Sequence, residues 1–246
     1  MKKVSVIIPT HNSSKYIKEC ILSVVNQTYN NLEIIIIDDK SNDNTLDIIK
    51  SIKDKRIEII ELEENVYTGI ARNKGIDSST GEYICFLDSD DYILPDKIEK
   101  QVKYMEDNNY DFTYTNFIYL KENDKKHYAK LPKKLDYKHA LKNTAILTST
   151  VMLNMKKLAK EDIYMPNLKR GQDTACWWTI LKKGYIAYNI PEYLTYYRVH
   201  SKSLSSNKNS AIKRTWNLYK LEDISYFKKI YCFICYAINA VKRRIL

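Results

Sequence analysis

The amino-acid sequence predicts an α/β fold in which a mostly parallel central sheet is flanked by helices. Three short, nearly continuous apolar runs occur at residues 4–8, 32–37 and 83–87. Parallel strands that are buried on both faces have this composition, because helices cover the two sides of their sheet. Between these runs the apolar residues recur at helical spacing, and such an alternation of strands and helices is typical of an α/β protein.

The elements expected in the first part of the chain follow one another without long linkers. Strands are predicted at residues 4–8, 32–37, 57–60 and 83–87, and helices at 16–25, 46–52 and 68–76. The first helix is supported by one apolar stripe that consists of Tyr16, Ile17, Cys20, Ile21, Val24 and Val25. Residues 77–81 are rich in turn-forming side chains, which end the third helix.

The patterns beyond Pro95 are weaker. They predict a helix to residue 107, strands at 111–119, 148–153 and 185–188, and a helix at 173–183. Residues 121–143 are polar and lysine-rich, and we expect them to form a mobile excursion. Residues 198–209 are expected to form a polar loop.

Length and composition fit a globular protein. The chain has 246 residues, of which 44% are hydrophobic and 28% charged, and these values argue against a fibre or a disordered chain. Residues 1–120 hold 14 basic and 21 acidic residues, a net charge of −7, whereas residues 121–246 hold 26 and 9, a net charge of +17. A basic half suits a polyanion such as a diphosphate, an anionic membrane or nucleic acid, although a merely solvated lysine-rich surface is the alternative.

The five cysteines and the lengths of the apolar runs indicate in which cellular compartment the protein is found. The cysteines are odd in number and scattered, which favours a reducing cytosol over a secreted disulfide scaffold. The apolar run at 4–8 is too short for a signal peptide and is ended by Pro9. No apolar stretch reaches the ~20 residues of a membrane-spanning helix, so we expect a cytoplasmic protein.

Polar residues follow the predicted strands at the edge where α/β proteins bind ligands. The first strand ends in Pro9-Thr10-His11-Asn12, the second in Asp38-Asp39, and the fourth in Asp88-Ser89-Asp90-Asp91. Asp88 and Asp90 can face one ligand, and carboxylate oxygens are preferred by Mg²⁺ and Mn²⁺. Helix capping and turn formation are the alternative for these carboxylates. No glycine-rich dinucleotide fingerprint or P-loop is present to hold a phosphate.

Several segments in combination resemble the family 2 glycosyltransferases of GT-A fold. They are residues 4–12 (VSVIIPTHN), 26–28 (NQT), 33–45 (EIIIIDDKSNDNT), 65–76 (NVYTGIARNKGI) and 81–91 (GEYICFLDSDD). Residues 171–173 (GQD) with Trp177, and 197–200 (YRVH) with Ser203 and Ser205, extend the likeness, particularly to bacterial enzymes of cell-surface polysaccharide assembly. The resemblance implies a nucleotide-sugar-binding half at 1–120 and an acceptor-binding half at 121–222, and the apolar and basic pattern that follows predicts a C-terminal helix at 223–246.

The resemblance also implies roles for individual residues. The nucleotide would contact Pro9, Thr10, Asn12, Asp39, Asn65, Arg72, Asp88 and Ser89, with Asp39 accepting a hydrogen bond from the base, commonly uracil. Mn²⁺ or Mg²⁺ would be bound by Asp88, Asp90 and His200. The diphosphate would contact Arg198, His200, Ser203 and Ser205 in one donor-rich loop, for which a solvated surface loop is the alternative.

Asp173 is the candidate catalytic base, and Gln172 and Trp177 are the candidate acceptor-binding residues. In transfer with inversion a carboxylate must take the proton of the attacking hydroxyl. An ordinary helix N-cap is the alternative role of Asp173. The chain departs from the family at His11, often Tyr, at Lys40, usually Gly, and at Gln172, often Glu.

The C-terminal apolar run at 230–238 is flanked by Lys228-Lys229 and by Lys242-Arg243-Arg244. It suits a helix that lies in an anionic membrane interface, and packing against the catalytic domain or a second subunit is the open alternative. We therefore expect an inverting, metal-dependent transferase that moves a sugar from a nucleoside diphosphate, with UDP preferred, to a glycan or polyprenyl-diphosphate-linked acceptor. A non-catalytic nucleotide-sugar-binding subunit of the same fold is the alternative, and no nucleic-acid partner is expected, because no binding motif is present.

Overall fold

A computed structural model describes residues 1–121, 123–200 and 208–245, with only the course of the chain at 208–211 and 242–245. Its described strands form one ten-stranded sheet in the order β3-β2-β1-β4-β9-β6-β10-β5, with β7 paired to β6 and β8 to β10. The strands are β1 (Val4–Thr10), β2 (Leu32–Asp38), β3 (Ile57–Glu61), β4 (Tyr83–Phe86), β5 (Tyr92–Ile93), β6 (Phe112–Lys121), β7 (Lys126–Ala129), β8 (Lys134–Leu135), β9 (Met152–Asn154) and β10 (Ala187–Val199).

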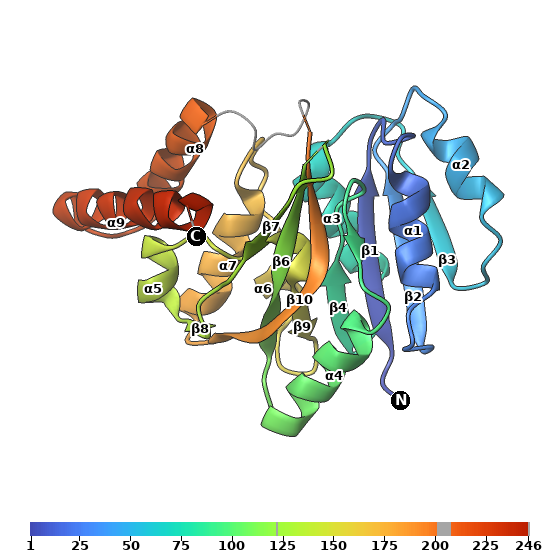
Figure 1. Ribbon diagram of the computed structural model, residues 1–246, viewed down its shortest axis with the longest axis horizontal. Coiled ribbons are helices and arrows are strands. Elements are labelled where there is room, and N and C mark those ends of the chain that lie inside the picture. The colour runs from blue at the N-terminus through green and yellow to red at the C-terminus, as the bar shows by residue number, and fades with distance from the viewer. Residues whose placement is uncertain (122, 201–207, 246) are drawn as a thin grey trace.

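Helices cover both faces of this sheet (Figure 1). They are α1 (Ile17–Val25), α2 (Thr45–Ser51), α3 (Tyr67–Ser78), α4 (Lys97–Asn108), α5 (Tyr137–Lys142), α6 (Lys160–Ile163), α7 (Gln172–Lys182), α8 (Lys208–Leu221) and α9 (Tyr226–Ile245), with a 3₁₀ turn at Thr148–Thr150. Apolar residues of α1, α2 and α4 form the core on one face, and those of α3, α5, α6 and α7 form the core on the other.

The buried character of β1 and β2 follows from their sequences. Alternate residues of β2 point to opposite faces, so Ile34 and Ile36 join one core while Ile35 and Ile37 join the other. Strands β3, β2, β1 and β4 are mutually parallel. The prediction of a mostly parallel sheet flanked by helices is confirmed, and it brings the carboxyl ends of four parallel strands to one edge.

The weaker patterns of the second half led to three errors. Residues 121–143, expected to form a mobile excursion, contain the regular elements β7, β8 and α5 in the part that the structure describes. Residues 148–150 form a 3₁₀ turn, so the strand β9 begins only at Met152. The strand expected at 185–188 runs from Ala187 to Val199 beside β6, which places Arg198 on the sheet and not in a loop.

The last two helices lie at one end of the molecule (Figure 1), far from α1 and α2. Helix α9 contacts α5 and α8, and Tyr219 of α8 stacks on Trp178 of α7, with ring centroids 5.3 Å apart. The helical extension predicted at the C-terminus is therefore present. Among the described residues, no helix is both long and apolar enough to cross a bilayer.

Candidate active site

A cavity of about 1400 Å³ opens at the carboxyl ends of the parallel strands. Eleven of the residues predicted for the site line it: Pro9, Thr10, Asn12, Asp39, Arg72, Asp88, Ser89, Asp90, Gln172, Asp173 and His200. Strand register explains much of this convergence, because Thr10 pairs with Asp38 and Ile7 pairs with Phe86. Asn65, Trp177 and Arg198 are not in the lining, and Ser203 and Ser205 lie outside the described residues.

One end of the cavity is built around Asp39. Its carboxylate accepts a hydrogen bond from the backbone N–H of Val66 over 2.7 Å. Its backbone carbonyl accepts from Asn65 Nδ2 at 3.2 Å and lies 2.7 Å from His11 Nδ1. Asn65 therefore holds the Asp39 segment in place from the rim of the cavity. Thr10 Oγ1 is buried beside it with no partner among the described residues, so this hydroxyl is available to a ligand.

The neighbouring Asp38 has a different role. Its carboxylate accepts hydrogen bonds from the backbone N–H and the hydroxyl of Ser41, at 3.0 and 2.6 Å. Ser41 Oγ in turn accepts the N–H of Asn12 at 2.9 Å, and Asn12 Oδ1 accepts the N–H of Asn42 at 2.7 Å. Asp38 thus stabilises the turn that positions Asn12, as the turn-forming alternative predicted.

The residues after β4 concentrate negative charge. Asp88 is ion-paired with the buried Arg72, whereas Asp91 is fully buried and accepts bonds from Ser149 Oγ at 2.5 Å and from the N–H of Arg198 at 3.1 Å. Burial, and then the charge of Asp88, raise the pKa of Asp90. Burial and the neighbouring carboxylates raise the pKa of Asp91 well above its ordinary value. A cation would relieve this repulsion.

The geometry around Asp90 fits a small divalent ion. Asp90 Oδ2 lies 3.0 Å from His200 Nε2, and both residues line the cavity. The two atoms are hydrogen-bonded to each other here. Adjacent ligands of an octahedral ion with bonds of 2.0–2.1 Å are also about 3.0 Å apart, so an ion that displaces the shared proton fits between them. The described residues contain no cluster of three or more metal-ligating side chains, and Mg²⁺-type sites take their remaining ligands from water and substrate phosphates.

Arg198 lies behind the acidic turn. Its guanidinium pairs with Glu19, donates to the carbonyl of Asp90 at 3.0 Å, and lies 4.9 Å from the ring centroids of Tyr16 and Tyr92. These contacts hold the side chain away from the cavity lining. Arg198 therefore positions Asp90, and its predicted contact with the diphosphate stays a prediction.

Asp173 occupies the second position of α7 and faces the cavity. Its Oδ2 accepts from Thr148 Oγ1 at 3.1 Å and its Oδ1 from the N–H of Thr174 at 2.7 Å. The residue that caps α7 is Gly171, whose φ is +81°, so the simple N-cap alternative for Asp173 is wrong. A glycine is required there because a side chain rarely adopts that φ.

Gln172 precedes Asp173 and packs on α3. A Cβ on Gly69 would approach Gln172 Cγ to 2.9 Å, so the absence of a side chain at Gly69 makes room for Gln172. The Gln172 side chain is buried, and its Oε1 has no partner among the described residues. This oxygen can accept a hydrogen bond from a hydroxyl group bound in the cavity.

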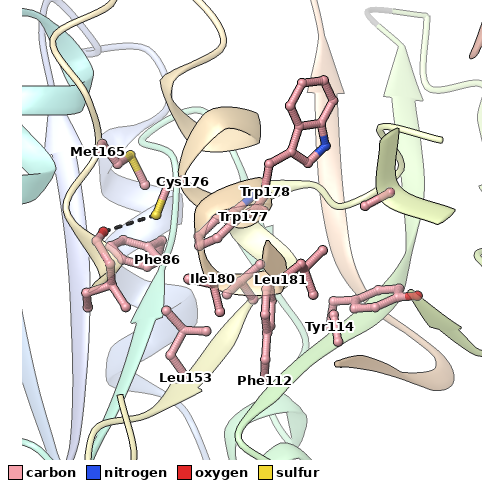
Figure 2. Packing of buried hydrophobic residues seen from close by; sticks show 14 of the residues in the cluster. Phe86, Phe112, Tyr114, Leu153, Met165, Cys176, Trp177, Trp178, Ile180 and Leu181 are labelled. Carbon is pink, nitrogen blue, oxygen red and sulfur yellow. Dashed lines mark hydrogen bonds between the residues drawn. The ribbon is translucent and has the colours of Figure 1, made fainter. Parts of the chain in front are cut away.

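Trp177 does not reach the cavity, which corrects the expectation that it contacts the acceptor. Figure 2 shows it in the core, and its ring centroid lies 5.9 Å from that of Phe86 and 5.4 Å from that of Phe112. It follows Asp173 by four positions on α7, but it is only 2% exposed. The helix turns its side chain into the sheet, so Trp177 anchors α7 and with it Asp173.

Replacing Trp177 with Ala is expected to lower the free energy of unfolding by about 3–5 kcal/mol, because a large buried ring is removed. The smaller change Trp177→Phe should cost less and should leave the KM for acceptor unchanged. Urea unfolding and initial-rate kinetics measure the two effects. A selective rise in acceptor KM for Trp177→Phe, at unchanged stability, would contradict the core assignment.

Several residues that support the site or line its cavity were not predicted from the sequence. Thr148 and Ser149 bond Asp173 and Asp91, and both are fully buried hydroxyl residues. The sequence feature that could have identified them is the run of three successive hydroxyl side chains at 148–150, which we predicted to be part of a strand. Basic side chains, contributed by Lys121, Lys125, Lys126, Lys169, Arg170 and Arg214, also line the cavity.

Comparisons with known proteins show what the chain is similar to. The family model described as Glycosyl transferase family 2 matches residues 5–162. The chain is 41% identical to TuaG of Bacillus subtilis, a glycosyltransferase assigned to teichuronic acid biosynthesis, over 98% of this chain and 97% of that protein. It is 39% identical to WfaP of Escherichia coli, named a UDP-Glc:α-D-GlcNAc-diphosphoundecaprenol β-1,3-glucosyltransferase, over 98% and 95% of the two chains.

Solved structures share the fold. Staphylococcus aureus TarS, residues 1–349 in complex with UDP-GlcNAc, superposes with a TM-score of 0.71 at 22% identity, over 94% of this chain and 70% of that one. Mannosyltransferase PcManGT of Pyrobaculum calidifontis, solved with GDP-Man and Mn²⁺, gives 0.71 at 17% identity, over 95% and 68%. The matched segment includes the strand ends that carry Asp39, Asp88 and Asp90, and from it we conclude that the chain belongs to glycosyl transferase family 2.

Proposed function

We propose that this protein transfers a sugar from a nucleoside diphosphate sugar, with UDP as the preferred nucleotide, to a lipid-linked glycan acceptor in surface polysaccharide synthesis, with inversion at the anomeric carbon. One observation carries the proposal. A single cavity is lined by Asp39, by the acidic turn at Asp88 and Asp90, and by the carboxylate of Asp173. Such a cavity offers a nucleotide pocket, a cation site and a base within one enclosed space.

The donor would bind along the strand ends. Asp39 accepts a hydrogen bond from the base, while Pro9, Thr10 and Asn12 form the wall of the base pocket. Ser89 lies between the base and the diphosphate, where its hydroxyl is 2.7 Å from that of Ser13. Arg72 neutralises Asp88 from the protein side, which limits the repulsion between that carboxylate and the diphosphate.

Asp88, Asp90 and His200 would hold the Mn²⁺ or Mg²⁺ ion. When bound there, the ion supplies positive charge that offsets the charge developing on the leaving nucleoside diphosphate. Arg198 keeps the backbone of Asp90 in place through its carbonyl. Ser149 does the same for Asp88, because its hydroxyl accepts the N–H of Asp88 at 3.1 Å.

Asp173 would act as the general base. As the acceptor hydroxyl attacks the anomeric carbon, a new C–O bond forms, the bond to the diphosphate oxygen breaks, and the hydroxyl proton passes to Asp173. Thr148 and the N–H of Thr174 orient the carboxylate. Gln172 Oε1, which has no partner among the described residues, would accept a hydrogen bond from a second hydroxyl of the acceptor sugar.

The basic side chains in the cavity lining suit an acceptor that carries a diphosphate. Arg214 of α8 lies against Gly171, because a Cβ added to that glycine would be 3.1 Å from Arg214 Cγ. The Arg214 side chain is therefore next to the segment that carries Asp173. Two Escherichia coli relatives are named for acceptors linked to diphosphoundecaprenol. We propose that the sugar transfer takes place in the cytoplasm at the inner face of the cell membrane, where such lipids are available.

The test is release of nucleoside diphosphate from a panel of sugar donors, with and without a short-chain polyprenyl-diphosphate GlcNAc acceptor. We expect acceptor-dependent release with at least one UDP-sugar. The anomeric coupling constant of the product, measured by proton NMR, should indicate a β linkage from an α-linked donor. Absence of release with every donor, or a retained α linkage, would contradict the proposal.

A further inference from the structure

Helix α9 has one buried side and one exposed apolar side. Cys232 and Tyr236 are 1% and 6% exposed and pack toward the body of the protein. The opposite side carries Phe227, Tyr231, Ile234, Ile238 and Val241, which are 83%, 55%, 53%, 50% and 56% exposed. Exposed side chains of this size normally occur singly. Here they are contiguous along the helix, spaced by four and three residues.

An apolar groove of about 580 Å³ between α8 and α9 continues this surface. Its walls are Ile212 and Trp216 of α8 and Ile230 and Phe233 of α9, and Lys213, Asn217 and Lys220 complete its lining. Viewed along the axis of α9, with 3.6 residues per turn, the apolar side chains cover an arc of about 160°. Phe233 lies at one edge of this arc and Tyr231 at the other. We call the exposed stripe and this groove together the α8–α9 face.

All the charged residues of helices α8 and α9 are basic. Helices α8 and α9 contain nine lysines and arginines and no acidic residue. The basic residues Lys228, Lys229, Lys242, Arg243 and Arg244 stand at both ends of the apolar stretch of α9. A broad apolar arc with basic residues beside it is the pattern of a helix that lies in the interface of an anionic bilayer.

We infer that the α8–α9 face docks on the surface of an anionic lipid bilayer, with the apolar arc of α9 inserted at the boundary between headgroups and acyl chains. The inference deepens the proposed function, since it rests on an acceptor that is itself a membrane lipid. It names the surface by which the protein meets that membrane.

A second copy of the chain is the competing occupant, and the charges disfavour it. Pairing two α9 helices would bring two sets of five basic residues together with no acidic residue on either helix to neutralise them. The apolar arc is also wider than the narrow seam of a two-stranded coiled coil. An anionic bilayer complements both features.

The same two helices border the cavity. Tyr236 and Ala240 of α9 and Arg214 of α8 line it, while the α8–α9 face lies on the other side of these helices. A bilayer on this face would therefore lie beside the part of the cavity that α8 and α9 border. Arg214 also lies next to Gly171, two residues before Asp173, so these helices adjoin the segment that carries the proposed base.

The test is flotation of the purified protein with vesicles of phosphatidylethanolamine containing 30% phosphatidylglycerol, compared with phosphatidylcholine vesicles. We expect partition into the anionic vesicles and several-fold weaker partition at 0.5 M than at 0.1 M NaCl. The double change Ile234→Ser/Ile238→Ser should reduce partition at least tenfold. The matched control Ile234→Leu/Ile238→Leu should retain it, and neither pair lies in the cavity lining.

Vesicle binding is measured without turnover, so its outcome is independent of the proposed reaction. Equal partition into phosphatidylcholine, or unchanged partition of the Ser variant, would overturn the inference. So would a dimer in sedimentation equilibrium that the Ser variant dissociates, because the face would then be an interface between copies. Circular dichroism of the Ser variant excludes unfolding as the cause of lost binding.

Discussion

Changing Asp173 to Asn is expected to lower kcat by about 10²–10⁴-fold, the range that a positioned general base contributes, while the affinity for nucleoside diphosphate stays within about twofold. The amide has the same shape and its oxygen can still accept the bond from Thr148 or Thr174, but it cannot take a proton. Initial rates with saturating donor measure the first effect, and calorimetric titration of UDP measures the second.

The control for this change is Asp107→Asn, which removes a carboxylate from the exposed end of α4, where it pairs with Lys103. Its rate should equal that of the unmodified protein. Full activity of Asp173→Asn would remove the base assignment. If the unmodified protein binds UDP but transfers no sugar to any acceptor, the result would support the alternative that it is a non-catalytic nucleotide-sugar-binding subunit.

The second large effect is expected at the cation site. Chelation with EDTA should abolish transfer, and added Mn²⁺ or Mg²⁺ should restore it, because the acidic turn otherwise repels the diphosphate. Asp90→Asn should lower kcat/KM at least 10²-fold, since it weakens one of two ligands that lie 3.0 Å apart. Turnover assays over a range of metal concentrations measure both changes.

The two variants should differ in their response to metal. Raising the Mn²⁺ concentration should partly restore Asp90→Asn, whose defect is ion affinity, and should leave Asp173→Asn unchanged, because its defect is proton transfer. Turnover that resists chelation would contradict the cation site. Restoration of Asp173→Asn by metal would show that Asp173 binds the ion and does not act as the base.

Local sequence was sufficient where a residue's role depends on its own strand. The apolar runs of β1, β2 and β4 predicted buried parallel strands, and the polar residues that follow them predicted a site at their carboxyl ends. Thr10, Asp39 and Asp90 could therefore be predicted from the sequence to share one site. The strand pattern has a period of two and the helix pattern a period of 3.6, and both are visible within a few residues.

The remaining assignments depended on contacts between distant segments, and these leave no periodic signal in the sequence. Trp177 and Asp173 are four residues apart on α7, yet only the packing of that helix on Phe112 decides that one is core and the other faces the cavity. The sequence around Arg198 predicts a phosphate-binding residue, whereas in the folded protein β10 places its guanidinium in an ion pair with Glu19. The fold class and the edge of the sheet that holds the site follow from local patterns in the sequence. Tertiary structure alone decided which charged groups are already paired, because ion pairing and burial depend on residues far apart in the chain.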